Sequence, residues 1–526
     1  MENNIIINND ESTTTFRYNQ LYLHVNNEIP YSRIKPTILC TDAIKINKAN
    51  ILLYKSTPQK IVYHDKTIKN DNSLPKTISY EQLSSLLNSD ELISINKDNK
   101  TYKDINSKVQ FDSDFESGNL RMAIELNELS EFDLIIRPET ESDKTYQWFF
   151  FSLICTEPSL DNTNIIKLNV INMVKDKMIF SSIIPVLIYN SQEEKWSRNT
   201  FNVYYYSNGI NCPKLKNINL CYSTLSFSFT FVPNVKYYFA YGYPYTYTQL
   251  KLYLSTLNHN HNIRFGSIGK THNNIDIPLI VMTDFSSSKE EIGKRQCVLL
   301  TSRIHSGETS SSYVIQGVIE FLSDTSPENN VVQELLKKYI FKIVPMINVD
   351  GVILGNYRTN SKFKDLNRTW INPEQSNSIC VFHLKNLINK TLINRPIFFY
   401  CDFHGHSNKS NFFLYGCQKE NAPNYENVFM NVIHQINPHF DLSNCVNKIH
   451  ANKTKTGRAI LKNEFKVDLS YCLETSMTSI FHKEKKNKYI PFTIKEYKKI
   501  GHDFCLALHE ISNEEKFNQT IESLNK

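Results

Sequence analysis

The segment Gln296-Cys-Val-Leu-Leu-Thr-Ser-Arg-Ile-His305-Ser-Gly-Glu308 joins an apolar run to a histidine and a glutamate that are three residues apart. The apolar run is typical of a buried strand, so the two polar residues are expected just beyond its carboxyl end. A second apolar run, Pro396-Ile-Phe-Phe-Tyr-Cys-Asp-Phe, leads in the same way to His404-Gly-His406. Because open α/β sheets place their sites at the carboxyl ends of strands, we expect both clusters to meet there.

Two histidines and one glutamate, His305, Glu308 and His404, are ligands that zinc accepts. Three protein ligands leave a fourth position for water, which is the arrangement of a catalytic rather than a structural zinc. Bound zinc lowers the pKa of such a water to roughly 7 and polarises a carbonyl beside it. The sequence therefore predicts one zinc ion, although other divalent ions accept the same ligand types.

Three further motifs lie between the two histidine clusters, in the order Asn348-Val-Asp-Gly-Val, Gly355-Asn-Tyr-Arg358 and Asp365-Leu-Asn-Arg-Thr-Trp370, and a fourth, Leu473-Glu474, follows them. With the two histidine clusters, the series resembles the zinc carboxypeptidases, and most closely their cytosolic carboxypeptidase branch, which trims acidic C-terminal tails such as those of tubulin. Three upstream segments resemble the N-terminal domain of that branch: Phe115-Glu-Ser-Gly-Asn-Leu, Tyr146-Gln-Trp-Phe-Phe-Phe and Tyr243-Pro-Tyr-Thr-Tyr-Thr-Gln-Leu. The resemblance covers roughly residues 107–515.

The resemblance also implies roles for individual residues. Glu474 is expected to act as the general base, which takes a proton from water and gives it to the leaving amine. Arg358 is expected to stabilise the negative charge that develops on the scissile carbonyl oxygen. Asn367 and Arg368 would bind the terminal carboxylate of the substrate, which arginine recognises with two parallel hydrogen bonds. His406, the second histidine of its motif, is expected to support a ligand or to line the substrate site.

Three aspartates and one glycine are candidates for residues that support the site without contacting zinc or substrate. Asp402 is a candidate to orient a ligand histidine, and a surface role is equally compatible with its position. Asp350 with Gly351 is expected to form a turn, and Asp365 to support Arg368 from a buried position.

The specificity pocket is expected from Asn452-Lys-Thr-Lys-Thr-Gly-Arg458, because related enzymes line this pocket with that stretch of chain. Arg458 is the residue we expect to receive an acidic side chain. Lys453 and Lys455 suit either the pocket or a solvated surface. Digestive carboxypeptidases carry a mobile tyrosine in this region, whereas no tyrosine occurs here between Phe440 and Tyr471.

The order of apolar patterns predicts an α/β fold. Short β-like runs between residues 107 and 245 predict a small antiparallel β-sandwich domain. Residues 246–515 alternate strands with amphipathic helices and predict a zinc-carboxypeptidase-like mixed sheet covered by helices on both faces. Residues 1–106, rich in Asn and Lys, are expected to form a partly disordered N-terminal extension, and residues 516–526 a C-terminal tail.

Composition agrees with a cytoplasmic enzyme. The 526 residues carry a net charge of only +6, which does not indicate nucleic-acid binding. Eleven cysteines occur without any C-x-x-C pair, so reduced thiols are expected rather than a disulfide framework. The first residues lack the pattern of a secretory signal, and no apolar stretch reaches the roughly 20 residues that a membrane span needs.

The sequence therefore predicts a zinc-dependent metallocarboxypeptidase that removes C-terminal glutamate from acidic protein tails, with tubulin as the expected partner and possible association with microtubules. Two alternatives stay open at this point. An N-acyl-amino-acid amidohydrolase shares the H-x-x-E, a distant histidine and D-L-N-R, whereas a microtubule-associated binding protein would have lost activity. Oligomeric state, the role of residues 1–106 and the preference for chain or branch-point glutamates do not follow from the sequence.

Overall fold

A computed structural model describes residues 57–65, 76–88, 101–127, 130–139, 147–159, 163–174, 186–212, 221–326, 328–419, 422, 424–482 and 488–525. The described chain forms two compact units. The N-terminal unit contains the described residues up to Pro244 together with Leu354–Tyr357, and the C-terminal unit contains Tyr245–Ile353 and the residues from Arg358 onward.

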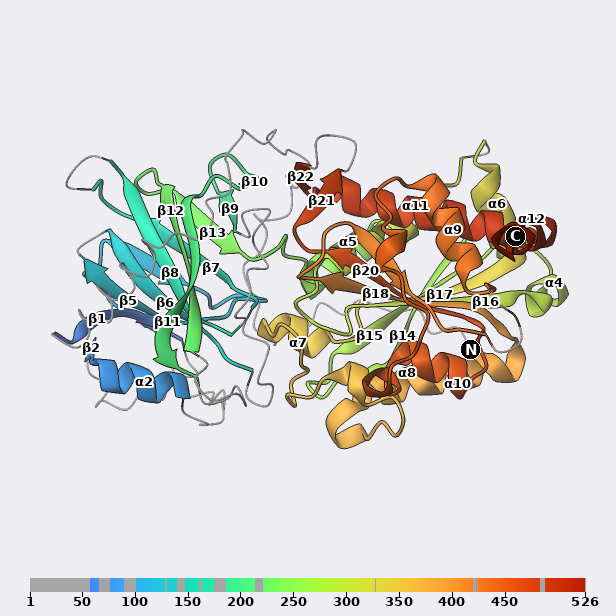
Figure 1. Cartoon of the computed structure of the whole chain (residues 1–526), viewed down its shortest axis with the longest axis horizontal. Coiled ribbons are helices and arrows are strands. Elements are labelled where there is room, and N and C mark those ends of the chain that lie inside the picture. The colour runs from blue at the N-terminus through green and yellow to red at the C-terminus, as the bar shows by residue number, and fades with distance from the viewer. Residues whose placement is uncertain are drawn as a thin grey trace. The chain divides into compact units, whose positions relative to one another are not determined.

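The N-terminal unit is built from two β-sheets (Figure 1). The larger sheet contains Gln59–His64 (β1), Thr77–Ile78 (β2), Tyr102–Lys103 (β3), Leu120–Asn127 (β5), Glu131–Ile136 (β6), Ile165–Met173 (β8), Phe201–Asn211 (β11) and Cys221–Thr230 (β12). Its order is β11-β12-β8-β6-β5-β1-β2, with β3 beside β1. The smaller sheet contains Val109–Asp112 (β4), Phe150–Cys155 (β7), Leu187–Asn190 (β9), Lys195–Ser197 (β10) and Lys236–Ala240 (β13), in the order β10-β9-β13-β7-β4. One helix, Tyr80–Asn88 (α2), belongs to this unit.

Aromatic side chains join the two sheets of this unit. Phe229 of β12 lies with its ring centroid 4.8 Å from that of Phe239 on β13, and Phe111 of β4 lies 5.2 Å from Phe132 of β6. All four rings are buried, so the alternating aromatic residues form the core of a sandwich. The pairing is antiparallel except between β6 and β8, which run parallel.

The C-terminal unit contains a seven-stranded mixed sheet. Its strands are Ile263–Lys270 (β14), Asp276–Met282 (β15), Gln296–Ser302 (β16), Tyr339–Val344 (β17), Ile397–His406 (β18), Phe412–Tyr415 (β19) and Leu469–Ser476 (β20), in the order β14-β15-β17-β16-β18-β20-β19. The four central strands β17, β16, β18 and β20 are parallel. Their carboxyl ends therefore lie along one edge. A separate hairpin pairs Ser479–His482 (β21) with Lys488–Pro491 (β22).

Helices cover both faces of this sheet (Figure 1). The helices after Tyr245 are Tyr247–Ser255 (α3), Lys289–Lys294 (α4), Ser310–Leu322 (α5), Asn330–Lys338 (α6), Val349–Leu354 (α7), Gln375–Asn394 (α8), Asn427–Ile436 (α9), Gly457–Asn463 (α10), Ile494–Ser512 (α11) and Glu514–Asn525 (α12), with short 3-10 turns at Leu366–Arg368 (η1), Leu442–Asn444 (η2) and Ala451–Lys453 (η3). On one face Phe399 of β18 packs against Phe429 of α9 and Phe504 of α11. On the other face Leu384 of α8 and Leu461 of α10 share a core cluster with strand residues.

The predicted α/β fold with a preceding β-sandwich is confirmed. The helix-like apolar spacing at residues 311–322, 331–339, 425–436 and 494–511 of the sequence corresponds to α5, α6, α9 and α11. Tyr339, the last residue of the second of these stretches, instead begins β17. Within the predicted N-terminal extension, β1 pairs with β5 of the larger sheet; the exact domain bounds stay predictions.

Two further observations bear on the class of protein. Among the described residues, no helix combines the length and apolar character that crossing a membrane requires. The ten cysteines in the described part of the chain are all free.

A glycine on α11 permits its close packing against α5. A Cβ atom added at Gly501 would lie 2.2 Å from the carbonyl oxygen of Val314, which is backbone and cannot rotate away. We expect Gly501→Ala to lower the free energy of unfolding by about 1–3 kcal/mol, measured as a lower thermal midpoint. In Gly293→Ala, where a Cβ meets no atom within 4 Å, the midpoint should stay or rise; equal midpoints for both variants would contradict this packing.

Candidate metal centre and substrate site

Adjacent strands deliver the polar residues to one place. His305 and Glu308 lie in the loop between β16 and α5, and His404 lies near the carboxyl end of β18. Glu474 on β20 is the register partner of His404 in the parallel pair of strands. Paired residues on neighbouring strands point to the same face of a sheet, so the carboxylate and the imidazole share one side.

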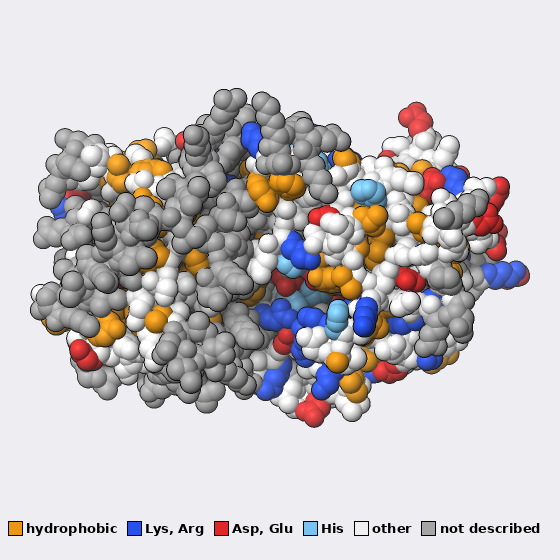
Figure 2. All heavy atoms as spheres, in the orientation of Figure 1, with side chains coloured by type: hydrophobic (Ala, Val, Ile, Leu, Met, Phe, Trp, Pro, Cys, Tyr) orange, Lys and Arg blue, Asp and Glu red, His pale blue; other side chains and the backbone are white. Residues whose placement is uncertain are grey.

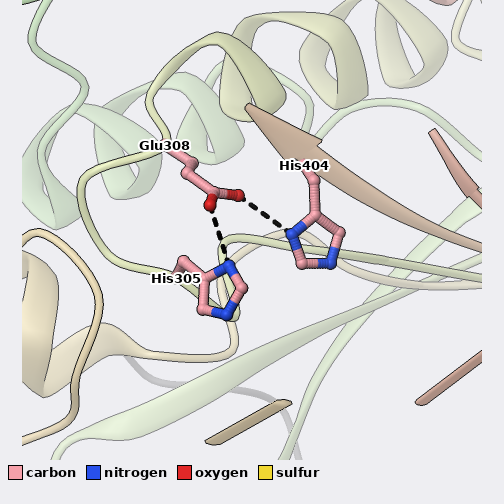
Figure 3. Close-up of side chains that lie close together, drawn as sticks. All are labelled: His305, Glu308 and His404. Carbon is pink, nitrogen blue, oxygen red and sulfur yellow. Dashed lines mark hydrogen bonds and ion pairs between the residues drawn. The ribbon is translucent and has the colours of Figure 1, made fainter. Parts of the chain in front are cut away.

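The three expected ligands form a compact group (Figure 3). The two carboxylate oxygens of Glu308 lie 2.8 Å from Nδ1 of His305 and 2.9 Å from Nδ1 of His404. All three side chains are buried. Burial alone would raise the pKa of Glu308, but the charges and hydrogen bonds of the two imidazoles hold it well below its usual range. An ionised carboxylate and two imidazole nitrogens within 4.8 Å of one another fit a zinc ion.

In each candidate ligand histidine, Nδ1 faces Glu308 and Nε2 contacts a different carboxylate. His404 Nε2 lies 2.8 Å from Asp402 Oδ2, and His305 Nε2 lies 3.2 Å from Asp365 Oδ1. Thr301 donates a hydrogen bond to the other oxygen of Asp402 at 2.9 Å. A carboxylate at Nε2 favours a proton there and leaves the Nδ1 lone pair for a metal. This arrangement supports the expected orienting role of Asp402, and it adds Thr301, which the sequence gave no reason to select.

Asp365 has a different partner from the one expected. Its Oδ2 atom accepts a hydrogen bond from Arg358 Nε at 2.8 Å, whereas sequence reasoning paired it with Arg368. Burial would raise the pKa of Asp365, but the charges of His305, Arg358 and Arg368 lower it strongly. One carboxylate therefore fixes both a candidate ligand and Arg358.

The residues expected to bind a terminal carboxylate lie beside this group. Arg368 donates from Nη1 to the carbonyl oxygen of Asn367 at 2.9 Å. The Asn367 side chain accepts a hydrogen bond from the Gly457 amide at 3.0 Å, and its Nδ2 lies 3.4 Å from His404 Nε2. The loop before α10 is thus attached to the segment that carries Arg368.

Glu474 lies within reach of a thiol. The Cys472 thiol donates to Glu474 Oε1 with a sulfur–oxygen distance of 3.6 Å, and both residues lie near His404. Burial raises the pKa of Cys472 to about 12, so this thiol stays protonated and can serve as a hydrogen-bond donor.

Arg458 and His406 have partners within the protein. The Arg458 guanidinium donates to the Gly416 carbonyl and lies 5.6 Å from the centroid of the Tyr415 ring. His406 Nδ1 accepts hydrogen bonds from the amides of Asn408 and Lys409, each at 3.1 Å. Arg458 therefore lies next to the strand that pairs with β20, and His406 supports the turn after β18. Their expected substrate roles stay predictions.

Arg303 is a further residue that sequence reasoning missed. It has a positive φ of 56° and is 2% exposed. Its guanidinium donates to the carbonyl oxygens of Ser306 and Tyr245, at 3.0 and 2.9 Å, and to Ser312 Oγ at 2.9 Å. These bonds fix the loop between His305 and Glu308. A charged residue at the end of an otherwise apolar strand was the signal that could have revealed it.

Similarity to known proteins agrees with this geometry. Residues 251–519, just over half of the chain, match the family model described as zinc carboxypeptidase. The chain is 32% identical to Cytosolic carboxypeptidase 1 of Danio rerio, across 82% of this chain and 40% of that protein. It is 29% identical to Cytosolic carboxypeptidase 2 of Mus musculus, across 79% of this chain and 48% of that protein. The chain thus spans less than half the length of these two relatives.

Solved structures share the fold. A metallo-carboxypeptidase from Burkholderia cenocepacia matches with a TM-score of 0.62 at 17% identity, covering 76% of this chain and 97% of that one. A metallo-carboxypeptidase from Pseudomonas aeruginosa matches with a TM-score of 0.61 at 19% identity, covering 78% of this chain and 100% of that one. At such identities the likeness concerns the fold alone. With the family model and the relatives above, the resemblance drawn from the ordered motifs is confirmed: this chain belongs to the zinc carboxypeptidase family and is similar to its cytosolic carboxypeptidases.

Proposed function

We propose that this protein is a zinc-dependent metallocarboxypeptidase that removes C-terminal glutamate from acidic protein tails, with tubulin as the expected target. One observation carries the proposal: a candidate base, Glu474, is paired with a candidate ligand, His404, on adjacent strands. Arg358 is joined to the candidate ligand His305 through Asp365, and the side chain of Asn367, the neighbour of Arg368, lies 3.4 Å from His404. The candidate ligands, the candidate base and the residues expected to bind a carboxylate are therefore close together, as removal of a terminal residue requires.

His305, Glu308 and His404 would hold the zinc ion, since their ligand atoms lie within 4.8 Å of one another. When bound, zinc lowers the pKa of a water molecule and polarises the scissile carbonyl. Asp402 and Asp365 keep the two imidazoles in the orientation that presents Nδ1. The three ligand side chains and the carboxylates behind them thus already lie close together in the structure.

Glu474 moves the proton. Its carboxylate takes a proton from the attacking water, and the hydroxyl adds to the acyl carbon of the last peptide bond. The carboxyl group of Glu474 then gives that proton to the amine nitrogen as the carbon–nitrogen bond breaks. The Cys472 thiol, which donates to Oε1, leaves the other carboxylate oxygen available for this transfer.

The two arginines have different tasks. Arg358, fixed by Asp365 through Nε, can direct its terminal N–H groups to the carbonyl oxygen that becomes negative. Arg368 and Asn367 bind the free carboxylate at the substrate's C-terminus. Because binding requires this free carboxylate, only the last residue of a chain can be removed, which makes the enzyme an exopeptidase.

The preference for acidic tails is supported by the charge around the site. Figure 2 shows Lys and Arg side chains gathered where histidine side chains reach the surface of the C-terminal unit. Arg458, which pairs only with neutral groups among the described residues, is the candidate for the terminal side chain. The similarity to proteins named cytosolic carboxypeptidases supports a cytoplasmic location, and tubulin as partner follows from the same resemblance.

A zinc-loaded sample incubated with a peptide ending in several glutamates should lose glutamate residues one by one in a mass spectrum. A chelator should abolish the loss. We expect Glu474→Gln to lower kcat/KM by about 100-fold to 10,000-fold with unchanged zinc content. Glu464→Gln, at an exposed position after α10, is the control and should behave like the parent. No loss of glutamate by the parent would reject the proposed activity.

Asp402→Asn should weaken zinc binding by about 10- to 100-fold, because the amide no longer accepts the Nε2 proton as a charged group. Competition with a chelator of known affinity measures this change directly. The exposed carboxylate Asp276 offers the control substitution Asp276→Asn. An unchanged zinc affinity in Asp402→Asn would remove Asp402 from the support of His404.

Arg458→Met should reduce kcat/KM more for peptides that end in glutamate than for peptides that end in glutamine. A charge-assisted hydrogen bond contributes about 1.5–3 kcal/mol, so we expect the preference for glutamate to fall about 10-fold or more. The measurement is the ratio of kcat/KM for the two peptides in parent and variant. An equal loss on both peptides would place the side-chain pocket elsewhere.

A further inference from the structure

Two aromatic rings on β19, those of Phe413 and Tyr415, lie along one side of the candidate base. Phe413 is the register partner of Glu474, and Tyr415 is the register partner of Cys472. Side chains two residues apart on a strand share a face, so both rings lie on the face of the sheet that carries Glu474. Their centroids are 5.4 Å apart, with the ring planes at 77°. The two rings therefore form one aromatic row in edge-to-face contact.

A cation lies at each end of this aromatic row. The guanidinium of Arg458 lies 5.6 Å from the centroid of the Tyr415 ring, and the ammonium group of Lys409 lies 4.6 Å from the centroid of the Phe413 ring. Because β19 and β20 are antiparallel, Phe413 lies nearer than Tyr415 to the carboxyl end of β20. Lys409 therefore lies at the end of the row nearer the edge of the sheet where α/β proteins bind their ligands.

Contacts with His406 fix the position of Lys409. The backbone amide of Lys409 donates to His406 Nδ1 at 3.1 Å, and the His406 ring lies 5.3 Å from the Phe413 ring, between centroids. His406 is the register partner of Ser476, two residues beyond Glu474 on β20. Lys409 thus lies in the turn after β18, beyond the candidate base in the direction of the carboxyl ends of the strands.

The ammonium group of Lys409 forms no ion pair with a carboxylate among the residues that the structure describes. Its neighbour there is the face of the Phe413 ring, which attracts a cation without neutralising its charge. The Lys409 side chain is half-buried. A partly desolvated cation of this kind would be stabilised by a carboxylate that enters the site.

We propose that Lys409 binds the carboxylate of an acidic residue that precedes the scissile bond of the substrate. The inference rests on the carboxypeptidase function proposed above and deepens it. When a terminal glutamate reaches Arg458, its peptide bond lies beside Glu474, and the preceding residues leave toward the carboxyl ends of the strands, where Lys409 lies. An acidic tail thus offers a carboxylate to each end of the aromatic row, whereas a single terminal glutamate offers its side chain only to Arg458.

The test compares two peptides that differ only before the last residue. One ends in Glu-Glu-Glu and the other in Gln-Gln-Glu, and release of the first glutamate by the zinc-loaded protein is measured as kcat/KM. We expect the parent to prefer the first peptide by about 5- to 20-fold, between the effect of an exposed ion pair and that of a buried charged hydrogen bond. Lys409→Met, which keeps an apolar stem over Phe413, should remove most of this preference by slowing cleavage of the first peptide alone.

Three further variants separate this subsite from other effects of charge. Lys409→Arg should keep the preference, because it returns a cation at the same position. Arg458→Met should slow both peptides by a similar factor and leave their ratio unchanged, since both end in glutamate. Lys289→Met removes an exposed lysine of α4, just before the amino end of β16, and should behave like the parent. Matching thermal midpoints exclude misfolding.

The outcomes distinguish this inference from the proposed function. An equal loss on both peptides in Lys409→Met, or a loss on neither, would overturn the inference. A parent that cleaves both peptides at the same rate would overturn it as well, and the carboxypeptidase function would stand. A parent that releases no glutamate from either peptide would reject that function, and the inference would fall with it.

Discussion

The buried carboxylate of Glu308 is the interaction on which the site depends. An ionised carboxylate loses its hydration on burial, and only strong partners offset that loss. Glu308 has three such partners: the imidazoles of His305 and His404, and the Gly405 amide at 3.0 Å from Oε2. The middle glycine of His404-Gly-His406 follows from this packing, because a Cβ at Gly405 would lie 2.8 Å from Ser310 Oγ and 3.0 Å from Glu308 Cβ.

Strand register converts this local arrangement into a complete site. The parallel pairing aligns Thr301 with Asp402 across β16 and β18, and His404 with Glu474 across β18 and β20. Side chains two residues apart on a strand share a face, so Asp402 reaches the imidazole of His404 from its own strand. A shift of one residue in β18 would turn these groups to the opposite face. The register of the buried strands, which the apolar core fixes, therefore specifies the geometry of the polar site at their carboxyl ends.

The sequence was sufficient to predict those elements and motifs whose signal lies within one short stretch of chain. The apolar runs before His305 and His404 predicted β16 and β18, and the ordered motifs predicted the fold family. The side-chain partners in the loops could not be foreseen: Asp365 accepts a hydrogen bond from Arg358, and Asn367 accepts one from the amide of Gly457, ninety residues away in the chain. Helix α8 was also missed. Its buried residues Val381, Leu384 and Ile388 follow helical spacing, but apolar side chains also lie outside that face, as at the exposed Ile393, which weakens the 3.6-residue period.

The distribution of charge around Glu474 suggests how an exopeptidase excludes the interior of a chain. In the proposed function, an interior peptide segment has no free carboxylate to offer, so it would leave the half-buried guanidinium of Arg368 without an anionic partner. A chain end supplies that partner. Discrimination then arises from the cost of leaving a partly desolvated charge unpaired, which exceeds the net gain from making the same contact. In the same proposal, Arg358, which Asp365 holds through Nε, would stabilise the charge that appears only during the reaction.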